Sequence, residues 1–177
     1  MMWFLSPPSL MAPAIVVAAS SPSPVMIARR TCPTDITQLT PQLLRDLPSY
    51  ANRVIVRSRS VEQLNSMPIV VLAGQAEYAP LPVVAEKSAS DPNLRQIFFT
   101  TLERQRVGKQ LRALQQYHWL LITPTSTGWQ IVLSYTRTGA YPQASWPVTP
   151  PRESSQGPIA QAAKLWFRDC HAGAVRS

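Results

Sequence analysis

The stretch of sequence that decides the fold is residues 94–138, LRQIFFTTLERQRVGKQLRALQQYHWLLITPTSTGWQIVLSYTRT. Gly108 and Lys109 stand in its middle as a two-residue turn signal, glycine first, between two long runs rich in apolar, aromatic and β-branched residues. This arrangement predicts a long β-hairpin in which Val107 pairs with Gln110.

That pairing places Phe98 opposite Trp119, and an aromatic cross-strand pair of this kind would hold the register. After a second loop at residues 124–128, the chain alternates apolar and polar side chains, as expected of a strand with one buried face. The sequence therefore predicts an antiparallel meander whose aromatic side is covered by another element. The alternating residues are Trp129, Ile131, Leu133 and Tyr135 on one side and Gln130, Val132, Ser134 and Thr136 on the other.

Two helices flank the predicted sheet. Thr40 and Pro41 are typical of a helix start, and three leucines follow on one side of a short helix that should end before Pro48. Near the end of the chain, Gly157 and Pro158 open an amphipathic helix that we expect to cover the sheet. The leucines are Leu43, Leu44 and Leu47, and the apolar stripe of the second helix is Ile159, Ala162, Ala163, Trp166, Phe167 and Cys170.

Three segments lie between the first helix and the hairpin. Residues 50–59 fit either an amphipathic edge strand or a second helix, and residues 68–73 form a short apolar run typical of a buried strand. Residues 78–84 contain two prolines and fit an edge strand or an extended loop. The predicted fold class is α+β: an antiparallel meander sheet of four to five strands, with a short N-terminal helix and a C-terminal amphipathic helix packed on one face.

Aromatic side chains fall into three clusters. We expect the first two clusters to be part of the core under the C-terminal helix. The third cluster lies in the Pro-rich residues 141–151, which we expect either to run in an extended conformation across the sheet or to bind a partner. The clusters are Tyr117 with Trp119, Trp129 with Tyr135, and Tyr141 with Trp146.

The first residues indicate export. No charged residue precedes Arg29, and the apolar run at residues 10–19 is too short to span a bilayer. Val17 and Ala19 are small residues at the positions that signal peptidase reads, although residues 1–9 carry no Lys or Arg. The predicted division of the chain is a signal peptide at residues 1–19, a disordered linker at 20–31 and a single α+β domain at 32–175.

The chain has two cysteines, Cys32 and Cys170, close to the two ends of the predicted domain. In an exported protein this pair indicates one disulfide, whereas in a cytosolic protein it would be two buried free thiols. A zinc site is much less favoured, because Cys170 and His171 are sequence neighbours and point to different sides of a helix.

Positive charge is concentrated in two segments. The 177 residues carry a net charge of +8, with 45% hydrophobic and 15% charged residues, and the excess of Arg falls in residues 29–59 and 95–112. If these segments are adjacent they form a basic face for an anionic partner; otherwise the charges are solvated side chains that keep the protein soluble. The residues of the predicted basic face are Arg53, Arg57, Arg59, Arg95, Arg104, Arg106 and Arg112.

The sequence lacks zinc, EF-hand, Walker and dinucleotide-binding motifs, so no metal and no cofactor is predicted. No catalytic residue is assigned, and whether the protein is an enzyme stays open, with the balance against. His118 is expected to be a hydrogen-bonded histidine on the less buried face of the sheet rather than a catalytic base. One polar site is noted on the sheet, formed by Glu103, Gln116 and His118.

Four runs resemble an uncharacterised family of small exported cyanobacterial proteins: LRDLPSYANRVI at residues 44–55, FFTTLERQ at 98–105, QQYHW at 115–119 and RDC at 168–170. The similarity covers about residues 32–175. It implies an extracytoplasmic location, in the periplasm or the thylakoid lumen, and no assigned activity.

The sequence is therefore compatible with two functions. The first is a non-enzymatic exported binding or structural protein whose basic face meets an acidic protein or an anionic membrane surface; nucleic acid is not expected outside the cytoplasm. The second is an α+β cone that binds or hydrolyses a small molecule through Glu103, Gln116 and His118. A concave pocket with a raised pKa of Glu103 would favour the second, and a filled core with a contiguous Arg surface would favour the first.

Overall fold

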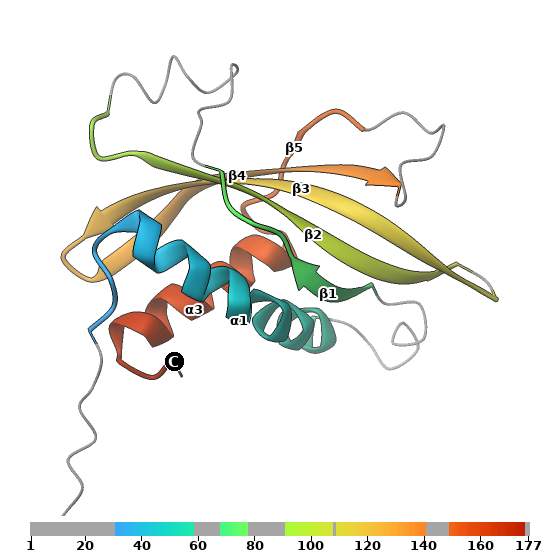
Figure 1. Ribbon diagram of the computed structural model, residues 1–177, viewed down its shortest axis with the longest axis horizontal. Helices are drawn as coiled ribbons and strands as arrows, with labels where there is room; N and C mark the ends of the chain where they lie inside the picture. The colour runs from blue at the N-terminus through green and yellow to red at the C-terminus, as the bar shows by residue number, and fades with distance from the viewer. Residues whose placement is uncertain (1–30, 59–67, 78–90, 108, 141–148, 176–177) are drawn as a thin grey trace, which may run out of the picture.

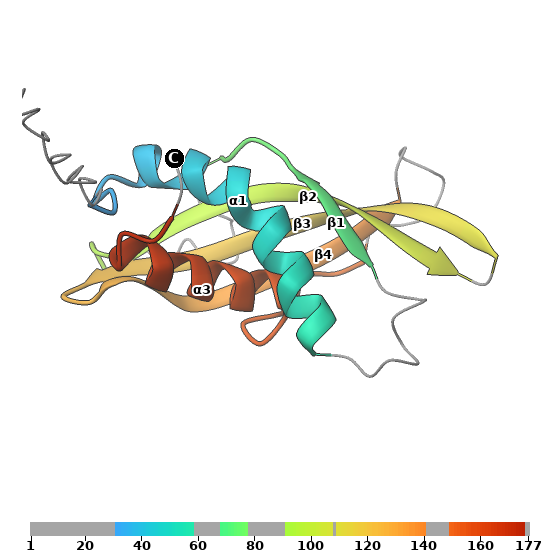
Figure 2. The same ribbon diagram turned by 90° about the horizontal axis from the view of Figure 1, so that it is seen from below.

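The computed structural model describes residues 31–58, 68–77, 91–107, 109–140 and 149–175. Within these ranges a five-stranded antiparallel sheet, in the order β1-β2-β3-β4-β5, is covered on one face by helices α1 and α3 (Figures 1 and 2). This is the α+β meander that the sequence predicts. The elements are α1 (Ile36–Arg57), β1 (Ile69–Ala73), β2 (Arg95–Val107), β3 (Gln110–Thr125), β4 (Gly128–Ala140), β5 (Arg152–Glu153) and α3 (Pro158–His171).

The predicted hairpin register is confirmed. Val107 lies opposite Gln110 at the turn between β2 and β3, and Phe98 lies opposite Trp119. The centroids of these two rings are 5.0 Å apart. Because side-chain direction alternates along a strand, this pairing fixes which residues of both strands share a face.

The sheet has a helix face, which packs on α1 and α3, and an opposite outer face. Residues directly opposite each other in antiparallel strands lie on the same face, so the register assigns every paired side chain to one of the two. Sheet residues in the helix-face core are Val70, Ile97, Phe99, Leu120 and Ile122, while Phe98, Tyr117, Trp119 and Tyr135 lie on the outer face.

A β-bulge in β4 overturns part of the predicted aromatic core. Leu133 lies opposite Leu121, but Ile131 lies opposite Ile122, so Val132 is an extra residue between them. Trp129 and Ile131 therefore pack on the helix-face core, whereas Leu133 and Tyr135 lie on the outer face. The prediction that all four share one face is wrong, because an inserted residue reverses the alternation beyond it.

The predicted aromatic clusters are corrected in the same way. Tyr117 and Trp119 do not lie under the C-terminal helix, because they share the outer face with Phe98. Trp129 and Tyr135 lie on opposite faces of the sheet and form no cluster. The third cluster, Tyr141 with Trp146, lies outside the described residues.

Helix α1 is longer than predicted. It begins after Asp35, whose side chain accepts a hydrogen bond from the Thr37 amide at 2.8 Å, and it continues through both Pro41 and Pro48. Thr40 lies inside the helix and is not its cap. The helix persists beyond Pro48 because it buries further residues against the sheet, and this burial outweighs the lost backbone bond. The buried residues are Leu39, Thr40, Leu43, Leu44, Leu47, Ala51 and Ile55.

Of the two alternatives for residues 50–59, the helix is the one observed, as far as Arg57. The predicted buried strand at 68–73 is in fact the edge strand β1, in which Val70 is buried while Ile69 and Leu72 are exposed. Among the described strands it pairs only with β2. The predicted edge strand or loop at 78–84 lies outside the described residues.

The open side of β1 is completed by a side chain from α1. Asn52 Nδ2 donates to the Val70 carbonyl oxygen and Asn52 Oδ1 accepts from the Val70 amide, both at 2.9 Å. We expect Asn52→Ala to lower the free energy of unfolding by about 1 to 3 kcal/mol, because two backbone groups lose their partners. Denaturant unfolding and amide exchange at Val70 measure this. Gln42→Ala, on the same helix but with an exposed side-chain bond, should stay within about 0.5 kcal/mol of wild type.

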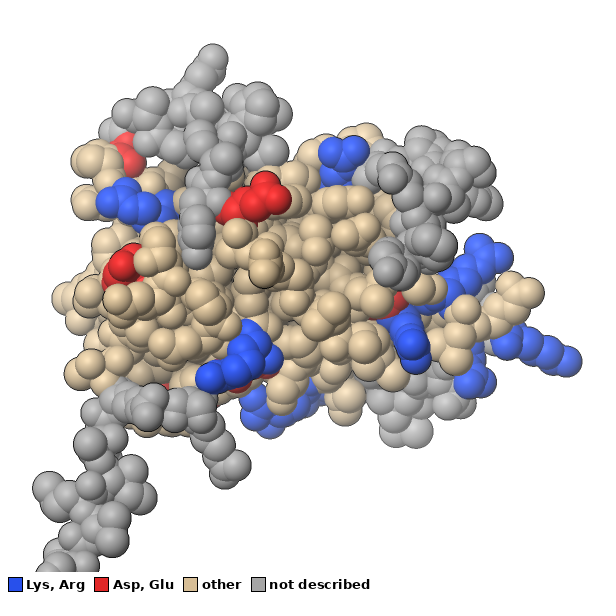
Figure 3. All heavy atoms as spheres, viewed as in Figure 1, with Lys and Arg blue, Asp and Glu red and all other residues tan. Residues whose placement is uncertain are grey.

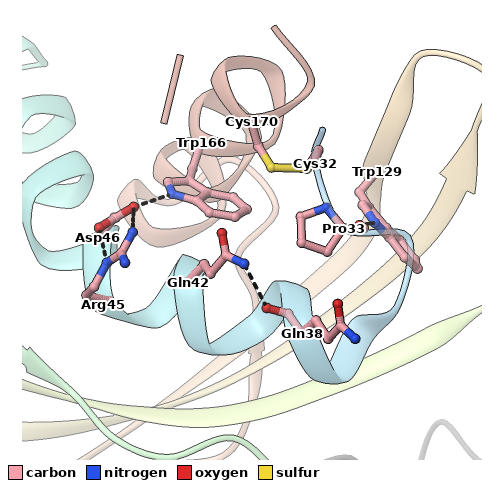
Figure 4. The surroundings of a disulfide bond; sticks show 9 residues. All are labelled: Cys32, Pro33, Gln38, Gln42, Arg45, Asp46, Trp129, Trp166 and Cys170. Carbon is pink, nitrogen blue, oxygen red and sulfur yellow. Dashed lines mark hydrogen bonds and ion pairs between the residues drawn. A yellow bond between two sulfur atoms is a disulfide. The ribbon is translucent and has the colours of Figure 1, made fainter. Parts of the chain in front are cut away.

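Helix α3 and the disulfide tie the two ends of the domain together, as predicted. Cys32 and Cys170 are bonded, with Cα atoms 5.2 Å apart, and no free cysteine remains (Figure 4). Trp166 of α3 is fully buried and its Nε1 donates to Asp46 Oδ2 of α1 at 2.9 Å, while Trp129 Nε1 donates to the Pro33 carbonyl oxygen at 2.9 Å (Figure 4). Across the described ranges, neither helix combines the length and the apolar character needed to cross a membrane.

Candidate functional site

A cavity of about 280 Å³ lies on the helix face of the sheet. Its polar wall comes from strands β2, β3 and β4 and from Ser154, and its apolar wall includes Ile55 of α1 and Ile159 of α3. The three residues of the predicted polar site line this one cavity. The lining residues are Ile55, Pro68, Glu103, Gln116, His118, Thr136, Thr138, Ser154, Gly157, Pro158 and Ile159.

Register explains why these polar residues converge. Gln116 lies opposite Thr101 of β2 and Thr138 of β4, so all three share the helix face. Glu103 is two residues beyond Thr101 and His118 is two beyond Gln116, which keeps both on that face. The apolar core fills the same face at the other end of the strands, and the helix face changes from apolar to polar at His118.

His118 is held by hydrogen bonds from both sides. Its Nε2 lies 2.9 Å from Thr101 Oγ1 and its Nδ1 lies 3.0 Å from Thr136 Oγ1. The ring also packs against Phe99, with centroids 5.1 Å apart. At 1% exposed on the helix face, His118 is on the more buried side of the sheet, contrary to the prediction, and this burial lowers its pKa to about 3.

Glu103 is the charged side chain of the cavity wall. It is 9% exposed, and this burial raises the pKa of its carboxyl group. Glu103 also accepts hydrogen bonds from Gln116 and from Thr101, whose Oγ1 lies 3.3 Å from Glu103 Oε1. These bonds lower the pKa of Glu103, but by less than burial raises it. Among the described residues, neither ion pair of the protein involves Glu103.

The hydroxyl groups around His118 form a directed chain. When Glu103 is ionised it can only accept, so Thr101 donates to it and the Thr101 oxygen accepts from His118. This assigns the proton of the neutral imidazole to Nε2, and Nδ1 then accepts from Thr136. The chain continues from Thr136 Oγ1 to Ser154 Oγ at 2.9 Å and from there to Ser134 Oγ at 3.0 Å.

This geometry gives a testable pH dependence. Burial lowers the pKa of His118 from its ordinary value of 6.5 to about 3 in the folded state. Between these two pH values the histidine is protonated in the unfolded state and neutral in the folded state, so the unfolded state binds one more proton. The contribution of His118 to the free energy of unfolding is therefore fully present above pH 6.5 and is lost as pH falls below it. Over this range the histidine alone raises the unfolding equilibrium constant about tenfold per pH unit. We expect His118→Gln to remove that slope in denaturant unfolding at a series of pH values.

The control for this measurement is His171→Gln, at an exposed histidine, which should keep the wild-type slope. Glu103 acts with the opposite sign, since a raised pKa contributes stability that is lost as pH rises through it. The difference between His118→Gln and wild type isolates the histidine. If the free energy of unfolding of wild type and of His118→Gln decreased equally with falling pH, His118 would not be a buried neutral imidazole.

The described residues of the predicted basic face do not form one surface. Arg53 and Arg57 are on α1, where the Arg53 guanidinium lies 4.2 Å from the centroid of the Tyr50 ring. Arg95 begins β2, about 30 Å along the strand from Arg104. Arg104, Arg106 and Arg112 do share the end of the β2–β3 hairpin, and Arg59 lies outside the described residues.

The polar residues that the sequence prediction missed come from β4 and beyond it. Thr136 and Thr138 alternate with Tyr135 and Arg137, which is a visible period-two signal once a strand is assumed. Ser154 carries no such signal. In the part of the chain that the structure describes, no three His, Cys, Asp or Glu side chains are grouped closely enough to hold a metal ion.

Comparison of the chain with protein-family models, with curated proteins and with solved structures gave no match.

Proposed function

We propose that this chain is an exported ligand-binding domain whose cavity takes a small polar molecule. The observation that carries the proposal is the convergence of a buried carboxyl group, a side-chain amide and hydroxyl groups on one cavity of about 280 Å³. This volume is at the lower limit of typical small-molecule sites, so the ligand would be of metabolite size. The pocket and the raised pKa of Glu103 are the two features that favour this function over a filled core.

The wall chemistry selects the ligand. An ionised Glu103 accepts hydrogen bonds, and the Gln116 amide oxygen already accepts from Thr138 Oγ1 at 2.7 Å. A complementary ligand therefore presents hydroxyl or amine donors toward Glu103. Its other side would contact Ile55 and Ile159, so a small polyol or primary amine with an apolar edge fits this cavity best.

Binding is favoured over hydrolysis by the state of His118. Both ring nitrogens are engaged by threonine hydroxyl groups, and a pKa of about 3 leaves the imidazole a weak base at neutral pH. A hydrolase would need a base with a pKa nearer to its working pH. His118 is better suited to orient Thr101 and Thr136 at the cavity wall.

The test compares ligand binding by wild type and Glu103→Gln in NMR titrations with a panel of small polyols and primary amines. Wild type should bind a member of the panel, and the variant should bind it at least tenfold more weakly. Glu77→Gln, at an exposed carboxylate, is the matched control and should bind like wild type. Affinity should also fall as pH decreases through the raised pKa of Glu103. Equal affinities for wild type and Glu103→Gln would contradict the proposal.

The location outside the cytoplasm, in the periplasm or thylakoid lumen, is part of the same proposal. It is supported by the Cys32–Cys170 disulfide, since such bonds persist in oxidising compartments, and by the signal-peptide pattern and the resemblance described above. Expression of residues 1–177 in a Gram-negative host tests it by intact mass. The periplasmic product should begin at Ser20 and lack two thiol hydrogens, whereas a full-length, reduced cytoplasmic product would contradict export.

A further inference from the structure

The far end of the β2–β3 hairpin combines exposed aliphatic and cationic side chains on the outer face. Ile69 and Ala113 both lie opposite Arg104, and Leu111 lies opposite Arg106, so these residues alternate across three strands. Leu111 is 64% exposed, Leu72 60% and Ile69 55%. We call this the hairpin surface; it comprises Ile69, Leu72, Arg104, Arg106 and Leu111, with Lys109 in the adjoining turn.

The charge of the hairpin surface is not neutralised. Residues 104–114 contain four cations and no Asp or Glu, and Glu103 just before them points to the helix face. Neither ion pair among the described residues involves these cations. Figure 3 shows Lys and Arg side chains gathered at the end of the molecule where this hairpin turns. An anionic surface would therefore gain attraction without breaking existing ion pairs.

The side chains beside the cations decide which anionic partner fits. Residues 104–114 contain no aromatic side chain on which a nucleic acid base could stack. An acidic protein would pair with the cations but would not require three exposed aliphatic side chains among them. A membrane interface uses both, because cations meet anionic headgroups while aliphatic groups enter the acyl boundary.

We propose that the hairpin surface docks on an anionic membrane surface. Arg104, Arg106 and Lys109 meet the headgroups, and Ile69 and Leu111 insert at the boundary of the acyl chains. The cavity is on the helix face, so it stays accessible in the docked protein. Docking and ligand binding therefore use separate residues and can be tested separately.

The test is co-sedimentation of the full chain with vesicles of phosphatidylcholine alone and of an equimolar mixture with phosphatidylglycerol. The protein should sediment with the mixed vesicles, less at high salt, and not with phosphatidylcholine alone. Arg104→Gln with Arg106→Gln should weaken the partition coefficient about fivefold for each charge removed. The matched control, Arg57→Gln with Arg152→Gln, removes the same charge elsewhere and should stay close to wild type.

Leu111→Ser separates a membrane from an acidic protein. Insertion of the aliphatic side chain predicts weaker vesicle binding at both low and high salt, with folding unchanged because Leu111 is exposed. Three results would overturn the proposal: no binding to the mixed vesicles, equal losses in the hairpin and control pairs, or a Leu111→Ser protein that binds like wild type. The last result would point to an acidic protein partner instead.

Discussion

Replacing Trp166 with alanine is expected to lower the free energy of unfolding by about 3 to 5 kcal/mol. The side chain is fully buried in the core cluster, and it contacts Phe167 edge to face, with ring centroids 5.8 Å apart. Its removal leaves a cavity where the two helices meet. It also deprives Asp46 of the hydrogen bond from Trp166 Nε1. Urea or guanidinium unfolding followed by circular dichroism measures the change.

Two further variants separate the contributions of packing and of the hydrogen bond. Trp166→Phe keeps an aromatic ring but loses the bond to Asp46, so it should cost less than Trp166→Ala. Val132→Ala shortens a side chain that is 57% exposed and should stay within about 0.5 kcal/mol of wild type. An unchanged melting temperature in Trp166→Ala would show that the ring does not hold the helices together.

Loss of the disulfide is expected to have a comparable effect. The bond closes a loop with a sequence separation of 138, and the chain-entropy treatment assigns such a loop about 4 to 5 kcal/mol of stability. The effect arises in the unfolded state, which gains freedom when the bond is absent. The variant Cys32→Ser with Cys170→Ser should therefore unfold at lower denaturant concentration and with a larger dependence on denaturant.

Reductant provides the internal control for this experiment. It should lower the stability of wild type toward that of the double variant and leave the double variant unchanged. If the oxidised wild type and the double variant unfold at the same denaturant concentration, the cross-link does not stabilise the domain.

The hairpin could be predicted from the sequence because its determinants are local. The turn signal of Gly108 and Lys109 in the sequence and the alternation on both sides of it predict the register, and the observed register places Glu103, Gln116 and His118 on one face. The cavity follows only when α1 and α3 are added, because Ile55 and Ile159 supply its other wall. The polar half of the site was thus accessible to sequence reasoning, and the enclosure was not.

Three features could not be predicted because they depend on tertiary structure. Pro48 signals a helix end, but burial of Ala51 and Ile55 continues α1 beyond it. The bulge at Val132 leaves no mark in the alternation of apolar and polar residues, although it moves Leu133 and Tyr135 to the other face. The depth of His118 depends on the helices that cover its face, which periodicity alone does not reveal.

The spatial distribution of the positive charges could not be predicted from the sequence either. Arg95 and Arg104 belong to one basic segment of the sequence, yet an extended strand separates them by about 30 Å. Sequence proximity therefore overstates spatial clustering in strands. The cations that do gather are those on both sides of a turn, where the chain doubles back.

The short distance between Cys32 and Cys170 places the two ends of the domain side by side. Their Cα atoms are 5.2 Å apart, so the first and last parts of the folded unit are held next to each other. Such a domain is suited to circular permutation: a short linker could join the present ends, and new ends could be opened at Ser126 and Thr127 in the exposed β3–β4 turn. By the same geometry, the unit could be inserted into a surface loop of another protein without separating the two sides of that loop.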